Sequence, residues 1–382
     1  MRKRETNFDL LRIASTIAVI FIHVGSYFVA ASFAYNLDDY GFVFAGNIFM
    51  SFVFDTLPRF AVPCFVMLSG AFILEDKRNA DFGYFYGKTF RSIGIPTIIF
   101  SLFYTLYNLL KSIGKVLIRC ENPIVLFEPL KRLLIGKPFY HMWYLYMLLI
   151  LYLLTPFIFI LQKELKNKEK KPGGYIFAFL CLASISYWTG TYTMGWDIGN
   201  AFCYLSYYLI GYKIRAWSKG RKSSVKGYCL ILIGFFGLAF LAFMRYKLAS
   251  SGVVIQKAGN VIVKDERLEV FAYEGLDPFV VIASVFIFAG FSLLDIKSNS
   301  IISHVSSVTF YIYLFHGGIL DVIKKLLQVK TSLIVQNNFA IPFYVVLVLA
   351  ASIVCTIIYC KLWKTLEQHW DITERLCKLF KT

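Results

Sequence analysis

Apolar segments long enough to cross a lipid bilayer recur along the whole chain, and they constrain its fold more than any other feature. The sequence is 58% hydrophobic and 16% charged, with a mean hydropathy of +0.62. A spanning helix needs about 20 mainly apolar residues, and inside a bilayer only helices and closed barrels satisfy their own backbone hydrogen bonds. The pattern therefore predicts an all-α integral membrane protein, folded as one domain over residues 1–382.

The spacing of the apolar segments predicts about ten transmembrane helices. An even number of crossings places both termini on one side of the membrane. That side is expected to be the cytoplasm, because the chain begins with MRKR and because segments 163–174 and 213–227 are rich in Lys and Arg. A short basic tail from about residue 363 is expected to lie along the inner leaflet. The expected spans are residues 9–34, 48–74, 91–110, 141–161, 175–190, 201–214, 228–246, 278–294, 305–327 and 341–362.

The first expected span carries Asp9, Arg12 and His23 where a membrane helix would normally be apolar. Arg12 and His23 lie eleven residues apart, close to three helical turns, so both should project from one face at a separation of about 16 Å. An ionisable group inside a span costs about 2.5–3.5 kcal/mol on insertion scales and usually marks a functional position. A place at the membrane interface would explain Arg12 as well, but His23 is too short to reach the interface from mid-membrane.

The second expected span contains an acid and a base four residues apart, Asp55 and Arg59, which can pair on one helical face. Pro58 and Pro63 should interrupt the helix beside them. An ion pair next to a broken helix fits the wall of a cavity, and it fits a purely structural contact equally well.

Further polar residues stand in or beside other spans. Lys88 and Arg91 are three residues apart at the edge of the third span, His141 begins the fourth, and His316 lies about 16 Å into the ninth. His316 fits either a site residue or a hydrogen-bonded histidine of the bundle, and the glycines that follow it should permit close helix approach. The basic loop 111–139 fits a shelf for an anionic acceptor, or contact with lipid headgroups.

Several classes of chemistry are not indicated. The sequence has no GxxxxGK[ST], GxSxG or HExxH motif, and its cysteines form neither a CxxC pair nor a cluster with histidines, so no metal is expected. The net charge of +17 lies mostly in short loops, where topology accounts for it without a nucleic-acid partner. Any chemistry must therefore come from polar residues buried among the helices, and histidine is the usual general base near neutral pH.

Four segments resemble the membrane-bound acyltransferase-3 family of bacterial O-acyltransferases. They are FDLLRIASTIAVIFIHV (8–24), RFAVPCFVMLSG (59–70), HMWYLYMLLILYLLTP (141–156) and FYIYLFHGGIL (310–320), in the family's order and spacing. The resemblance covers nearly the whole chain. It implies about ten transmembrane helices in the bacterial plasma membrane, with both ends in the cytoplasm. It also implies transfer of an acyl group, commonly acetyl from cytoplasmic acetyl-CoA, to a hydroxyl of an envelope polysaccharide, peptidoglycan or a lipid-linked glycan.

Carried over to this sequence, the resemblance implies catalytic roles for His23 and Arg12, and CoA binding by Arg12, Lys88 and Arg91. Two positions depart from the family pattern. Lys88 stands where an arginine is usual, and Gly317 replaces the proline that usually follows the ninth-span histidine.

The expected function is therefore O-acyl transfer, with His23 as general base or transient acyl carrier. Asp55, Arg59, His141 and His316 are expected to seat the acceptor, with membrane lipids around the bundle. A transporter or flippase for a lipid-linked sugar or polysaccharide is the alternative, because it would also have many spans and buried charges. A structural partner in an envelope-assembly complex is a third interpretation.

Overall fold

The computed structural model describes residues 5–33, 41–119, 122–167, 197–251, 254–257, 260–263, 276–326 and 340–370. These residues are almost entirely helical, as predicted, and one antiparallel hairpin of β1 (Val254–Lys257) and β2 (Asn260–Val263) departs from the all-α expectation. The helices are α1 (Thr6–Phe33), α2 (Gly41–Thr56), η2 (Leu57–Phe60), α3 (Ala61–Ile73), η3 (Lys77–Ala80), α4 (Phe82–Thr89), η4 (Phe90–Gly94), α5 (Ile95–Arg119), η5 (Pro123–Phe127), α6 (Glu128–Leu134), α7 (Trp143–Asn167), α9 (Asp197–Ser218), α10 (Ser224–Ser251), α12 (Pro278–Leu293), α13 (Ser300–Leu326) and α15 (Ala340–Trp370).

Within the described residues, 7 helical stretches are long and apolar enough to cross a membrane. The apolar helix α12 matches the eighth expected span but has 16 residues, and the 22-residue helix α9 covers the sixth without being among the seven. The fifth expected span, 175–190, lies outside the described residues. A helical membrane protein is thus confirmed, and the count of ten stays a prediction. The seven stretches are Thr6–Tyr27, Phe49–Ile73, Phe82–Ile118, Trp143–Leu161, Ser224–Lys247, Ser300–Leu326 and Ala340–Gln368.

Two predicted boundaries were wrong. The third span was expected at 91–110, but the helical stretch runs over Phe82–Ile118, through the π-helical turn η4 that joins α4 to α5. The chain was also expected to leave the last span near residue 363, whereas α15 continues to Trp370. The residues 361–370, KLWKTLEQHW, contain no Gly or Pro, so nothing in them ends a helix.

The second span is interrupted where the prolines predicted it. Helix α2 ends at Thr56, the 3₁₀ turn η2 carries Pro58 and Arg59, and α3 starts at Ala61 with Pro63 in its first turn. A proline in the first turn of a helix is tolerated because the missing N–H would have no partner there. The break places Arg59 on a tight turn next to the end of α2.

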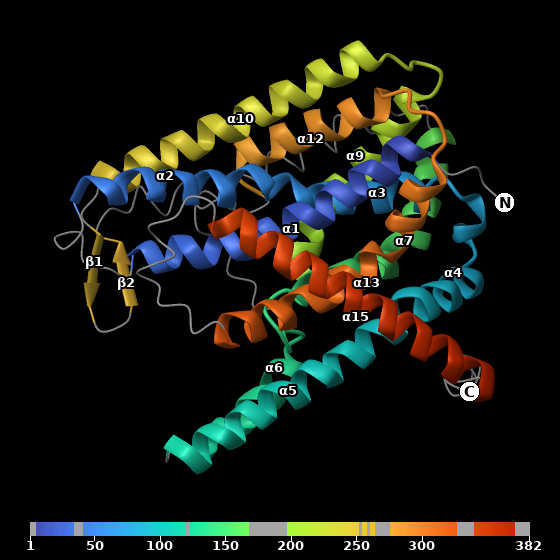
Figure 1. The fold of residues 1–382 in the computed structure, drawn as a ribbon. Coiled ribbons are helices and arrows are strands. Elements are labelled where there is room, and N and C mark those ends of the chain that lie inside the picture. Colours follow the sequence, from blue (N-terminus) through green and yellow to red (C-terminus); the bar gives the residue numbers. More distant parts are fainter. Residues whose placement is uncertain are drawn as a thin grey trace.

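Helix α1 runs through the middle of the bundle, with α10 and α12 on one side and α13 and α15 on the other (Figure 1). Helices α1 and α13 run in the same direction, because Arg12 lies against Ser306 and His23 lies against His316. The beginning of α1 and the end of α15 lie on the same side of the bundle (Figure 1). The far end of α5 extends away from the main bundle, with α6 beside it (Figure 1). The exposed leucines of α5 suit contact with lipid.

Candidate functional site

Three histidines from separate parts of the sequence meet inside the bundle. His23 comes from α1, His141 from the turn before α7, and His316 from α13. The ring centroids of His23 and His316 are 5.2 Å apart, and those of His141 and His316 are 4.8 Å apart. His316 therefore lies between the other two. We call His23, His141 and His316 the histidine trio. The sequence singled out each of them, and the structure brings them together.

The hydrogen bonds of His316 and His141 fix which ring nitrogens carry protons. His316 Nδ1 bonds the carbonyl oxygen of Tyr313, and His141 Nε2 lies 3.3 Å from the carbonyl oxygen of Leu314. A carbonyl only accepts, so each of these nitrogens donates, and in the neutral ring the other nitrogen is left with a lone pair. Those nitrogens, His316 Nε2 and His141 Nδ1, are buried and have no hydrogen-bond partner among the described residues. The trio thus contains two buried hydrogen-bond acceptors that no described residue satisfies.

Close approach of α13 to the turn before α7 depends on Gly317. A Cβ atom built on Gly317 would lie 2.3 Å from His141 Nδ1, well inside contact distance. The absence of a side chain at this position is what lets the His141 ring lie against α13. The glycine therefore permits a close approach to α13, as expected. The group that approaches is the His141 side chain rather than a second helix.

Tyrosines frame the trio, and the sequence analysis did not identify them. Tyr140 lies edge-on to His23 with ring centroids 4.8 Å apart. The Tyr313 hydroxyl donates to the carbonyl oxygen of His141, and the Tyr104 hydroxyl donates to that of Leu314 at 2.6 Å. Two of these tyrosines could have been found from the sequence, because they stand close to histidines already singled out. Tyr140 directly precedes His141, and Tyr313 lies three residues before His316.

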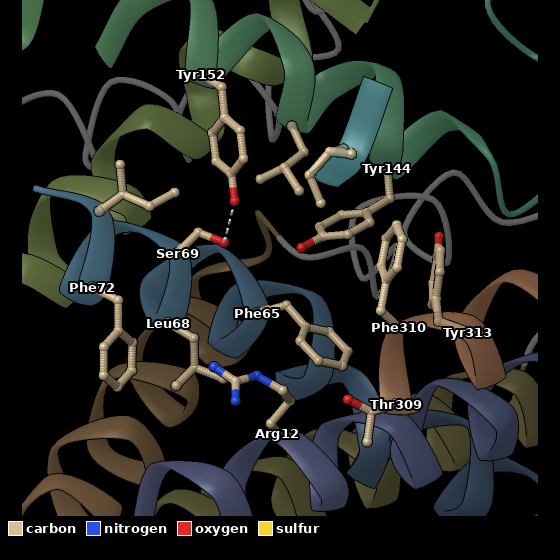
Figure 2. A pocket seen from close by; sticks show the side chains of 13 residues that line it. Arg12, Phe65, Leu68, Ser69, Phe72, Tyr144, Tyr152, Thr309, Phe310 and Tyr313 are labelled. Carbon is tan, nitrogen blue, oxygen red and sulfur yellow. Dashed lines mark hydrogen bonds between the residues drawn. The ribbon is translucent and has the colours of Figure 1, made fainter. Parts of the chain in front are cut away.

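A cavity of about 280 Å³ lies between α1, α3, η4, α7 and α13. Figure 2 shows Arg12 reaching into it from α1, with Phe65, Leu68 and Phe72 from α3 beside it. Arg12 is the charged side chain among the described residues that line this cavity; the others are apolar side chains, tyrosines and small hydroxyls. An apolar pocket with one placed charge is typical of a small-molecule site, although this volume is slightly below the usual range of about 300–1,000 Å³.

Tyr313 connects the cavity to the histidine trio. Its ring lines the cavity beside Tyr144, with the two centroids 5.5 Å apart (Figure 2). The same ring lies 5.3 Å from His316 and 5.5 Å from His141, measured between centroids. The cavity thus begins at Arg12 and ends at a side chain that touches the trio.

Arg12 is held in place by the acid that precedes it. Arg12 Nη1 lies 3.0 Å from Asp9 Oδ1 and 2.9 Å from Ser306 Oγ, so Asp9 and Arg12 form an ion pair within α1. Asp9 also accepts hydrogen bonds from Ser303 and Ser306 of α13. The Arg12 side chain keeps 32% of its surface exposed, so its neighbours cover it only in part.

Asp55 and Arg59 form the predicted ion pair, with 2.7 Å between Asp55 Oδ1 and Arg59 Nη2. The structure adds a second arginine that the sequence analysis missed: Arg245 of α10 lies 3.0 Å from Asp55 Oδ2. Ser26, three residues beyond His23, donates to Asp55 and accepts from Arg59. Arg245 could have been found as a basic residue near the end of an otherwise apolar span.

Lys88 and Arg91 are not brought to the cavity that Arg12 lines. Both side chains are exposed, and neither is among the described residues of the cavity wall. Lys88 lies over the ring of Tyr84, with Nζ 5.7 Å from the centroid. Arg91 belongs to η4, the same turn that contributes Ile93 to the cavity. Their role in binding a donor stays a prediction.

The bundle and its site define a helical membrane protein with a polar, histidine-containing interior next to a cavity. A family model described as an acyltransferase domain matches residues 5–360. The chain therefore belongs to this family, acyltransferase 3, as the resemblance of its four segments predicted. No curated protein and no solved structure matches the chain.

Proposed function

We propose that the protein is a membrane-bound O-acyltransferase of the bacterial plasma membrane. It would move an acyl group, acetyl in the first instance, from cytoplasmic acyl-CoA to a hydroxyl of an envelope glycan or a lipid-linked sugar. Family membership supports acyl transfer. The observation that carries the proposal is the histidine trio. Two of its buried nitrogens have no partner among the described residues, and Tyr313 joins the trio to a cavity that a half-buried arginine also lines.

In the proposed reaction, His23 takes the proton of the acceptor hydroxyl while the hydroxyl oxygen attacks the thioester carbonyl. A carbon–oxygen bond forms, the carbon–sulfur bond breaks, and the CoA thiolate leaves with the proton from the imidazolium. General-base assistance of this kind typically contributes about 10²–10⁴-fold to the rate. If His23 carries the acyl group transiently, the imidazole nitrogen replaces sulfur first and the hydroxyl then replaces the nitrogen.

Arg12 would bind the donor. A guanidinium can donate two parallel hydrogen bonds to the oxygens of one phosphate. Its positive charge also offsets the cost of placing an anion inside the helix bundle. With the start of α1 in the cytoplasm, Arg12 faces the compartment that holds acyl-CoA. The pantetheine arm would then follow the apolar cavity towards Tyr313 and the trio, and Lys88 and Arg91 would meet the outer phosphates.

The test is transfer from radiolabelled acetyl-CoA by membranes that carry the wild-type chain or His23→Ala. We expect label in envelope material with the wild type, and a fall of about 10²-fold or more with His23→Ala at equal protein level. His304→Ala is the matched control, because His304 lies exposed on α13 and should leave transfer unchanged. Wild-type transfer by His23→Ala would overturn the assignment of His23.

The transporter or flippase alternative makes a different prediction for the same membranes. It predicts movement of an unmodified lipid-linked sugar with no consumption of acyl-CoA. Membership of an acyltransferase family favours transfer over transport.

A further inference from the structure

A lysine lies beside the histidine trio on the side away from Arg12. Tyr27 stands one helical turn, about 6 Å, beyond His23 on α1. Lys324 of α13 faces it, with Nζ 4.0 Å from the Tyr27 ring centroid. The Lys324 side chain is half-buried, and its charge lies within electrostatic range of His23.

Lys324 forms no ion pair with any described residue. The acid nearest to it along α13, Asp321, is already shared by Lys111, 3.0 Å from Asp321 Oδ2, and by Lys325, 3.4 Å from the same oxygen. Asp321 also accepts a hydrogen bond from the Tyr107 hydroxyl. A partly desolvated ammonium gains free energy from an anion. Among the described carboxylates, Asp321 acts on Lys324 electrostatically but pairs directly with Lys111 and Lys325.

The same imbalance holds on the other side of His23. Asp55 is shared between two arginines, Arg59 and Arg245. Among the residues that the structure describes here, each of these carboxylates therefore faces more than one cation. A local excess of positive charge attracts anionic ligands.

We propose that Lys324 forms an anion subsite for the acceptor, so that the acceptor carries a phosphate or a carboxylate close to the hydroxyl that reacts. The anionic group would sit at Lys324 and Tyr27, one helical turn from His23, while the hydroxyl reaches His23. This inference rests on the proposed function. It narrows the acceptor class from glycans in general to anionic ones, among which sugar phosphates are the simplest.

The experiment compares two probes that share a sugar and an alkyl chain and differ in one phosphate: dodecyl glucosyl phosphate and dodecyl glucoside. Binding of each to the purified full-length protein in uncharged detergent is measured by isothermal titration, which needs no catalysis. We expect the wild type to bind the phosphate probe about tenfold tighter, the difference that one charge-assisted contact of about 1.4 kcal/mol gives. Lys324→Ala should remove this preference and Lys324→Arg should keep it.

Lys325→Ala is the matched control, because Lys325 is the neighbouring, exposed lysine and already pairs with Asp321. It should retain the preference for the phosphate probe. Equal affinity of the wild type for the two probes would overturn the proposal. So would an unchanged preference in Lys324→Ala, or an equal loss in Lys325→Ala.

A lipid headgroup could supply the same phosphate as an acceptor sugar. A competition experiment distinguishes these two sources of phosphate. If phosphatidylglycerol in the micelle displaces the probe as readily as glucose 1-phosphate does, the site binds headgroups and the acceptor subsite is excluded. The proposed function is tested separately by transfer from acetyl-CoA. Failure of that transfer would leave the binding result intact, and loss of the phosphate preference would leave the transfer intact.

Discussion

The imidazole rings of His23 and His316 stack with their centroids 5.2 Å apart and their planes 27° apart. They come from the first helix and from one of the last two helices of the described chain, which run in the same direction. The contact of Arg12 with Ser306 sets the register of these helices at one end, and the two rings lie opposite each other further along. The relative position of the histidines therefore depends on how α1 packs on α13.

Replacement of Arg12 by Ala should weaken donor binding more than it slows the chemical step. A hydrogen bond to a charged group contributes about 1.5–3 kcal/mol, so KM for acetyl-CoA should rise by about 10- to 100-fold. Steady-state kinetics on purified protein would measure KM and kcat separately. Ser306→Ala removes a neutral partner of Arg12 and should change KM far less. A fall in kcat alone would contradict a binding role for Arg12.

Gly317→Ala should displace the His141 ring and reduce transfer. The new Cβ would lie 2.3 Å from His141 Nδ1, so the ring or helix α13 must move. We expect a loss of unfolding free energy of about 1–3 kcal/mol, seen in denaturant titration of the solubilised protein. Gly237→Ala is the control, because a Cβ there meets no atom within 4 Å, and in a helix it should stabilise by about 0.5–1 kcal/mol. Equal effects of the two substitutions would contradict this account.

Arg245→Ala should destabilise the fold, because it leaves the buried Asp55 carboxylate with one guanidinium in place of two. Loss of one partner of a buried pair costs about 3–5 kcal/mol, and we expect the lower value because Arg59 remains. Arg221→Ala replaces an exposed arginine and should change the free energy of unfolding by no more than about 0.5 kcal/mol. Thermal unfolding of the two variants side by side decides the matter. Comparable midpoints would show that Arg245 does not stabilise Asp55.

Asp277 should make the protein less stable as the pH rises from about 4 to about 6. It precedes α12, outside the seven spanning stretches, and burial raises its pKa to about 6 although it accepts hydrogen bonds from the Phe279 and Val280 amides. Between its pKa in the unfolded chain and this raised pKa, the unfolded state releases a proton that the folded state keeps. Folding stability therefore falls across this window and is constant above it.

Asp277→Asn tests that pH dependence, because asparagine caps a helix as well as aspartate but does not ionise. Its unfolding midpoint at pH 7 should exceed that of the wild type by about 2–4 °C, and the two proteins should converge near pH 4. Asp277→Ala loses the cap at every pH and serves as the control. If Asp277→Asn is less stable than the wild type at pH 7, the buried carboxylate is stabilising in its charged form.

The amino-acid sequence by itself determined the class of fold and much of the set of polar residues. Apolar segments of spanning length can satisfy their backbone hydrogen bonds only as helices, so the helical membrane bundle needed no tertiary information. Local spacing also sufficed for the pair Asp55–Arg59, because residues four apart on a helix are neighbours whatever the helix packs against. The prolines likewise predicted the break between α2 and α3.

Only the tertiary structure decided which of these residues share a site. The histidine trio, the contact of Arg245 with Asp55 and the place of Lys324 beside Tyr27 each join helices that are distant in the sequence. No periodicity within one helix encodes which face of another helix it will meet, because that choice is made by side-chain packing over the whole bundle. Packing also left the exposed Lys88 and Arg91 off the cavity wall that Arg12 lines.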